Sequence, residues 1–125
     1  MLVDTDVLIW NLRGNPKAAE TLDANRGFSI SAVSYMELVQ GLRNQAELRV
    51  LRQALHFWQA QIIQVDAATS SRACYLVEQH ALSSSLFLAD ALIGATAAER
   101  GETLLTGNAK HYQVIEGLSV TVFRP

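Results

Sequence analysis

The chain has 125 residues, a length that suits one domain spanning residues 1–125. Hydrophobic residues make up 50% of it and charged residues 18%, which excludes a disordered chain and indicates a well-packed core. The formal net charge of −2 excludes a protein that grips nucleic acid along a broad basic face, but not an enzyme that touches a few phosphates.

Three further features predict a cytoplasmic protein with no membrane role. Cys74 is the only cysteine, so no internal disulfide can form and a reducing compartment fits. No basic segment followed by an apolar run, the mark of a signal peptide, opens the chain. The longest largely apolar stretch, 86–98, is too short to span a bilayer and contains Asp90. A mean hydropathy of +0.14 also indicates an apolar surface reserved for a partner.

Short apolar runs alternate with helical patterns along the chain. The expected strands are 1–4, 28–30, 62–65, 103–105 and 119–123. The expected helices are a short one ending near residue 12, then 17–25, 34–42, 46–60, 67–81 and 87–100. Such alternation predicts an α/β fold, in which a mostly parallel five-stranded sheet is flanked by helices on both faces.

Polar residues follow several of these strands. Asp4 comes directly after the first strand and Thr106 after the fourth, while Glu37 is expected in the first turn of the helix after the second. Because the carboxyl ends of parallel strands share one edge of the sheet, these side chains should lie close together. Crowded carboxylates favour the protonated form unless a cation neutralises them, so the pattern predicts a Mg²⁺ or Mn²⁺ site.

Two of these acids also have a purely structural interpretation. Asp4 or Asp6 could cap the following helix, but a single cap needs only one carboxylate. We favour Asp4 as a metal ligand, and Asp6 either supports the site or caps the helix. The run from Ser34 to Glu37 matches a capping box, with serine at the N-cap and glutamate three residues later. That capping role does not exclude metal binding, because a carboxylate in a first helical turn can also face the sheet edge.

Asp90 stands beside an apolar stripe on the helix 87–100. An unpaired carboxylate in such surroundings is costly, which favours a metal or a basic partner as compensation. The alternative is an acid in the first helical turn that the helix dipole stabilises.

The segment 105–112 is a polar turn after a strand. Thr106 and Asn108 are candidates to bind a water on the metal or a phosphate, Lys110 to neutralise a phosphate, and His111 to assist proton transfer. An ordinary Gly-Asn turn that opens a short helix explains the same residues without any chemistry. Elsewhere, Arg43, Arg49 and Arg52 fit either an RNA backbone or, with Glu47 among them, a solvated helix face.

Taken together, these segments resemble the PIN-domain ribonucleases, specifically the VapC toxins of bacterial toxin–antitoxin pairs. The resemblance covers essentially the whole chain, and its specificity lies in the order and spacing of the segments. The matching segments are LVDTD (2–6), SAVSYMEL (31–38), ADALI (89–93) with the Ala-rich helix behind it, and LLTGNAKHY (104–112) with the Ile-x-Gly-Leu tail after it.

The resemblance implies a sheet of strand order 3-2-1-4-5 and Mg²⁺- or Mn²⁺-dependent cleavage of RNA. It places the family's first three acids at Asp4, Glu37 and Asp90, and it implies a homodimer and a VapB-like antitoxin whose C-terminal segment covers the active site. A fourth acid is common in the turn after the fourth strand, but the turn here has none. Its absence puts in doubt whether a second metal ion binds when no substrate is present.

The sequence thus predicts a metal-dependent endoribonuclease that leaves 5′-phosphate and 3′-hydroxyl ends. Its catalytic residues would be Asp4, Glu37, Asp90, Thr106 and Asn108. The alternative is a catalytically inactive PIN-like module that acts through protein partners. A phosphoacceptor receiver domain fits less well: Asp66 follows the third strand, but Glu37 and Asp90 would then have no role.

Overall fold

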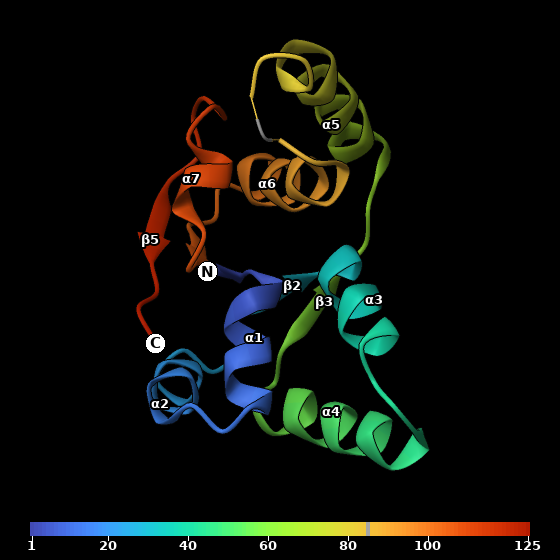
Figure 1. Ribbon diagram of the computed structural model, residues 1–125, viewed down its shortest axis with the longest axis vertical. Helices are drawn as coiled ribbons and strands as arrows, with labels where there is room; N and C mark the ends of the chain where they lie inside the picture. Colours follow the sequence, from blue (N-terminus) through green and yellow to red (C-terminus); the bar gives the residue numbers. More distant parts are fainter. Residues whose placement is uncertain (85) are drawn as a thin grey trace.

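The computed structural model describes residues 1–84 and 86–125. Within this part the strands are β1 (Leu2–Val3), β2 (Ser29–Ser31), β3 (Gln61–Ile63), β4 (Leu104–Thr106) and β5 (Val120–Val122). The helices are α1 (Thr5–Leu12), α2 (Pro16–Ala24), α3 (Ala32–Gln40), α4 (Gln45–Phe57), α5 (Ala67–His80), α6 (Leu88–Arg100) and α7 (Ala109–Tyr112) (Figure 1). Every expected strand and helix is present with its ends shifted by a few residues, and α7 is a short helix in the polar turn.

The five strands form one sheet in the order β3-β2-β1-β4-β5, and each neighbouring pair is parallel. This confirms the predicted fold class and strand order. Leu2 of β1 pairs with Ser29 of β2 and with Leu104 of β4, so β1 lies at the centre. Because all the strands run the same way, Asp4 and Thr106 come out at the same edge.

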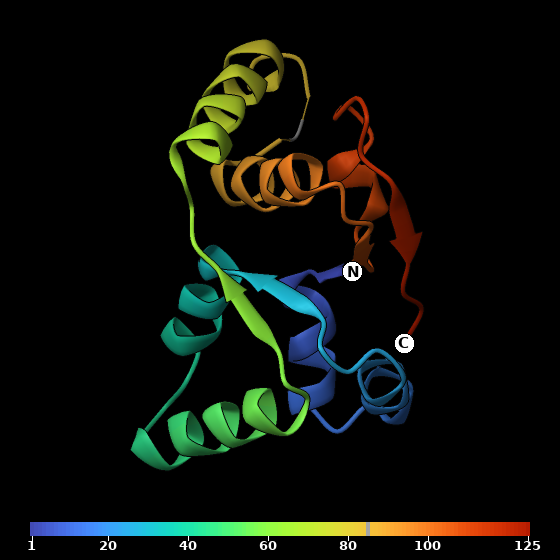
Figure 2. The same ribbon diagram turned by 180° about the vertical axis from the view of Figure 1, so that it is seen from behind.

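Helices cover both faces of the sheet (Figures 1 and 2). The helices α1, α2 and α4 pack on one face and α5, α6 and α7 on the other, while α3 contacts both α1 and α6. Consecutive strand residues point to opposite faces. Val3 and Leu105 therefore join the core under α1, whereas Leu2 and Leu104 join the core under α6. Burial on both faces explains why these short strands read as continuous apolar runs.

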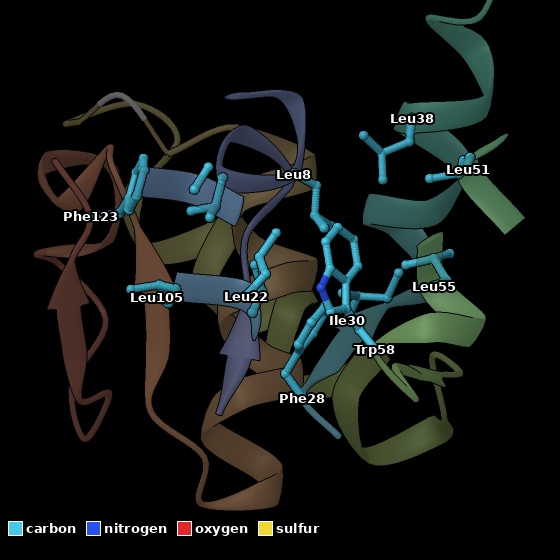
Figure 3. Packing of buried hydrophobic residues seen from close by; sticks show 13 residues of the cluster. Leu8, Leu22, Phe28, Ile30, Leu38, Leu51, Leu55, Trp58, Leu105 and Phe123 are labelled. Atoms are coloured by element: carbon cyan, nitrogen blue, oxygen red, sulfur yellow. The ribbon is translucent and has the colours of Figure 1, made fainter. Parts of the chain in front are cut away.

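Trp58, at the end of α4, anchors the core on the α1 face (Figure 3). Its ring centroid lies 5.9 Å from that of Phe28, and its indole nitrogen donates a hydrogen bond of 2.7 Å to Asp23. In the same helix Leu51 and Leu55 are buried whereas Arg49 and Arg52 are exposed. That distribution agrees with the solvated-face interpretation of the arginines. None of the helices in the described part is long and apolar enough to cross a membrane.

The predicted capping box between Ser34 and Glu37 is wrong. Helix α3 begins two residues earlier than expected, at Ala32, and the side chain of Ser31 caps it by accepting a hydrogen bond of 3.1 Å from the Val33 N–H. Strand β2 runs directly into the helix, so Ser31 is already in the extended conformation that a cap requires. Glu37 consequently lies beyond the first turn, and its carboxylate is free for another role.

Candidate metal centre

Asp4 lies at the carboxyl end of the central strand, only 6% exposed. Its Oδ1 accepts a hydrogen bond of 2.8 Å from the Thr5 N–H and caps α1. Its Oδ2 accepts one of 2.8 Å from the Thr106 hydroxyl and one of 2.9 Å from the Tyr112 hydroxyl. The capping and ligand interpretations of Asp4 are therefore compatible, because three donors hold its carboxylate in one orientation at the sheet edge.

Burial raises the pKa of Asp4 above its usual value, and the nearby Asp90 adds to this effect, although the hydrogen bonds from Thr106, Tyr112 and Thr5 oppose it. Thr106 is fully buried behind Asp4, and its hydroxyl also accepts a hydrogen bond of 3.0 Å from the Asn108 N–H. Because its hydroxyl donates to Asp4 and accepts from the Asn108 N–H, Thr106 supports the Asp4 carboxylate.

Glu37 reaches the same edge from α3, and its side chain is exposed. The Oγ1 atom of Thr5 lies 2.7 Å from Glu37 Oε1 and 2.8 Å from Ser34 Oγ. A carboxylate only accepts and Thr5 has a single proton, so Thr5 donates to Glu37 and Ser34 donates to Thr5. Thr5, which directly follows Asp4, thus orients the Glu37 carboxylate.

Asp90 reaches the edge from the start of α6, and 15% of its side chain is exposed. Its Oδ2 accepts a hydrogen bond of 3.3 Å from the Phe87 N–H and lies 3.7 Å from His111 Nδ1. The alternative prediction, an acid in the first helical turn, thus describes its local role. The same position brings the Asp90 carboxylate close enough to Asp4 for its charge to help raise the pKa of that carboxyl.

Asp6 adds a fourth carboxylate to this edge. Burial, followed by the charge of Asp4, raises its pKa from 3.8 to about 6. Its Oδ2 accepts hydrogen bonds from Gly107 and Asn108 in the turn after β4. Its Oδ1 is buried and has no hydrogen-bond partner in the described part of the chain. Leaving a buried acceptor unsatisfied costs roughly 1–3 kcal/mol. Asp6 does not cap α1, since Asp4 does.

These residues suit a hard divalent cation. The pKa values of Asp4 and Asp6 are both raised by burial and by a neighbouring acid, so positive charge at this edge would stabilise the ionised forms. The available donors are carboxylate oxygens, which Mg²⁺ and Mn²⁺ prefer. In the part of the chain that the structure describes, no three His, Cys, Asp or Glu side chains are gathered closely enough to enclose an ion.

The PIN domain family model matches residues 1–116. The chain belongs to the PIN-domain family. It is 34% identical to "Ribonuclease VapC10" of Mycobacterium tuberculosis (strain CDC 1551 / Oshkosh), over 94% of this chain and 90% of that protein. This similarity, with the family match, confirms the predicted resemblance to the VapC group of PIN domains.

Solved structures show the same fold. A chain of a toxin–antitoxin complex from Klebsiella pneumoniae superposes with a TM-score of 0.80 and 30% identity, covering 97% of this chain and 95% of that one. A chain of the DNA-bound VapBC from Salmonella typhimurium superposes with a TM-score of 0.80 at 21% identity, covering 97% and 96%. At 21% identity, the similarity to the Salmonella typhimurium structure shows only that the fold is shared.

In this PIN domain, Thr5, Ser34 and Tyr112 hold the acids of the site, a role that sequence reasoning did not assign to them. Tyr112 lies on α7 and is 2% exposed, with its hydroxyl directed at Asp4. Its place depends on Gly94 of α6, where an added Cβ would lie 3.4 Å from the Tyr112 ring and 2.5 Å from Ile115. The signal that could have identified Tyr112 is its hydroxyl group, because the hydroxyl of a buried tyrosine usually finds a hydrogen-bond partner.

Proposed function

We propose that this chain is a metal-dependent endoribonuclease that acts as the toxin of a toxin–antitoxin pair. The observation that carries the proposal is the buried Asp4 carboxylate, held by three donors at the sheet edge to which α3 and α6 bring Glu37 and Asp90. Membership of the PIN-domain family and the ribonuclease name of a 34% identical relative support it.

Asp4, Glu37 and Asp90 would hold one Mg²⁺ or Mn²⁺. Asp4 and Glu37 are preoriented by their hydrogen-bond donors, whereas Asp90 would exchange its contact with the Phe87 N–H for the cation. When bound, such a cation activates a water and offsets the charge of the scissile phosphate. Hydrolysis that breaks the bond between phosphorus and the 3′ oxygen would leave 5′-phosphate and 3′-hydroxyl ends. His111 lies 3.7 Å from Asp90 with 41% of its side chain exposed, and it is our candidate to assist proton transfer beside this edge.

The partner we propose is a VapB-like antitoxin. A groove of about 720 Å³ lies between α1, α3 and α4 and includes Glu37 at one side, with Ile9, Leu38 and Val50 as apolar contacts and Arg13 and Arg43 as charged ones. An antitoxin C-terminal segment that filled it would cover Glu37. The 30% identical structure from Klebsiella pneumoniae is that of a toxin–antitoxin complex, which supports this proposal.

We also propose that the chain is a cytoplasmic homodimer. Tyr75, Leu82, Phe87 and Leu88 expose large apolar surfaces around α5 and the start of α6, which a second copy would cover. The thiol of Cys74 is exposed and free, which suits a reducing compartment. Sedimentation equilibrium of the antitoxin-free chain would give twice the 13.7 kDa chain mass if the dimer is right.

The proposed activity is tested by incubating total cellular RNA with the purified, antitoxin-free chain and Mg²⁺ or Mn²⁺, and mapping the 5′-phosphate ends. Discrete cuts that require the metal and disappear in Asp90→Asn support the nuclease. Cuts that persist in a chelator, or equally in Asp90→Asn, contradict it.

The second candidate is an inactive PIN module that works only through partners. Two observations favour it: no three ligands are already gathered in the described residues, and the turn after β4 carries no carboxylate. A folded chain that binds its antitoxin but neither Mn²⁺ nor Mg²⁺ would establish this alternative.

A further inference from the structure

Asp6 connects two segments that are far apart in the sequence. From the first turn of α1, its Oδ2 accepts a hydrogen bond of 2.9 Å from the Gly107 N–H and one of 3.2 Å from the Asn108 side-chain Nδ2. The turn between β4 and α7 is therefore fastened to the N-terminus of α1, next to Asp4.

These contacts fix the orientation of the Asn108 amide. An ionised carboxylate can only accept, so the Asn108 amide must turn its NH₂ group, and not its carbonyl oxygen, toward Asp6 Oδ2. The Asn108 carbonyl oxygen then points away from Asp6, and none of the hydrogen bonds among the described residues uses it. The backbone is fixed as well, because the Asn108 N–H donates to the Thr106 hydroxyl that holds Asp4.

Gly107 leaves the room that this arrangement needs. A Cβ added at Gly107 would lie 2.6 Å from Asp6 Oδ2, closer than real Cβ atoms approach other heavy atoms. Its φ is not in the left-handed region, so the glycine is required by the close approach of Asp6 and not by the backbone conformation.

We propose that Asp6 is a positioning residue that acts through Asn108: it makes the turn present a carbonyl oxygen, which recognises a hydrogen-bond donor. We assign this donor to the attacking water. The RNA phosphate can only accept, and a contact with the RNA 2′-hydroxyl, which can donate, would instead appear as a change in KM. The inference rests on the proposed ribonuclease activity. It separates the two roles that the sequence leaves open for Asn108, binding a water or binding a phosphate.

The first test measures amide hydrogen exchange in the full chain by NMR, without RNA. Asp6→Ala removes both acceptors, so exchange of the Gly107 amide should rise by about tenfold or more, while α6 amides stay protected. Asp6→Asn keeps an oxygen at the position of Oδ2 and should restore most of the protection. Asp66→Asn, at the exposed N-cap of α5, is the matched control and should change neither group.

The second test is kinetic. Asp6→Ala and Asn108→Ala should each lower kcat by roughly tenfold to a hundredfold and leave the KM for RNA within about twofold, as expected for a contact made in the transition state. Asp6→Asn should recover most of the kcat. If Asp6 acts through Asn108, the double alanine variant should be no slower than the slower single variant.

Four results would overturn the inference. One is Gly107 protection that survives in Asp6→Ala. The second is an Asp6→Asn variant as slow as Asp6→Ala with the turn still protected, which would show that the charge of Asp6 matters and not its position. The third is a rise in KM without a change in kcat, which would assign Asn108 to the RNA. The fourth is additive losses in the double variant. Because the exchange test needs no substrate, an inactive chain would refute the proposed function while leaving the Asp6 contact separately measurable.

Discussion

The Tyr112 hydroxyl donates a hydrogen bond of 2.9 Å to Asp4 Oδ2, across 108 residues of sequence. Both side chains are buried at the carboxyl edge of the sheet. Burial, with the charge of Asp4, raises the pKa of Tyr112 far above its usual range, so the phenol keeps its proton and remains a donor. Asp4, a catalytic candidate between β1 and α1, is thus oriented by a residue of α7, the penultimate element of the described chain.

Tyr112→Phe should leave the fold intact and weaken Mn²⁺ binding. The variant keeps the ring that packs near Gly94 but removes one of the three donors to Asp4. Loss of a residue that orients a metal ligand typically costs tenfold or more in affinity, so we expect a Kd raised by roughly tenfold in a calorimetric titration. An unchanged Kd would show that Thr106 and Thr5 suffice to hold Asp4.

Thr5→Val should weaken RNA cleavage more than Thr5→Ser. Valine has nearly the shape of threonine but cannot donate to Glu37, whereas serine keeps the hydroxyl. Since Glu37 is otherwise exposed, its carboxylate would sample more rotamers, and we expect a loss of about tenfold in kcat/KM for the valine variant. Equal activities of the two variants would remove Thr5 from the site.

Stability in metal-free buffer should depend on Asp6. Its pKa is about 6 in the folded chain against 3.8 for the unperturbed group, so the folded state holds more protons between these values. The stabilisation that the protonated Asp6 provides is full below 3.8 and is lost as the pH rises through about 6.

Asp6→Asn isolates this effect because it cannot titrate. The difference in Tm between Asp6→Asn and the parent should therefore grow in favour of the variant as the pH rises from about 4 to about 7. Excess Mg²⁺ should shrink that difference by neutralising the ionised Asp6. A difference in Tm that stays constant with pH would place Asp6 in contact with solvent.

Gly94→Ala should destabilise the protein by roughly 1–3 kcal/mol in urea unfolding, because the added methyl group overpacks the core. Its Cβ would lie 2.5 Å from Ile115 Cδ1, in the packing that seats Tyr112. Gly41→Ala is the matched control: Gly41 is exposed, has a φ of −82°, and its added Cβ would meet only ordinary contacts at 3.5 Å or more. If both variants unfold at the same urea concentration, Ile115 moves aside freely.

The sheet and the position of Asp4 at its carboxyl edge were predictable because each depends on local sequence. Apolar runs such as Leu2-Val3 and Leu104-Leu105 mark strands that are buried on both faces. Because the strands are parallel, the residues that follow them lie at the same edge of the sheet. The start of α3 was harder, since Ser31 and Ser34 are both acceptable caps. Only the strand geometry of β2 selects Ser31.

The supporting contacts were not predictable, because they join distant segments. Nothing local in the sequence pairs Asp6 with Gly107, or Thr5 with Glu37, and each pair exists only after β1, β4 and α3 have met. Tyr112 could equally have packed as a core aromatic with its hydroxyl directed at the solvent. Its direction toward Asp4 follows from how α7 packs on α6 beside Gly94.

The most direct test of the account is a calorimetric titration of Mn²⁺ into the antitoxin-free chain and into Asp90→Asn, with RNA cleavage measured on the same samples. We predict saturable binding to the parent, affinity weaker by about tenfold or more in the variant, and cleavage that follows the fraction of chain with metal bound. Equal Mn²⁺ affinity in the two proteins, or cleavage by a parent chain that binds no metal, would contradict the assignment of Asp4, Glu37 and Asp90 as the metal centre.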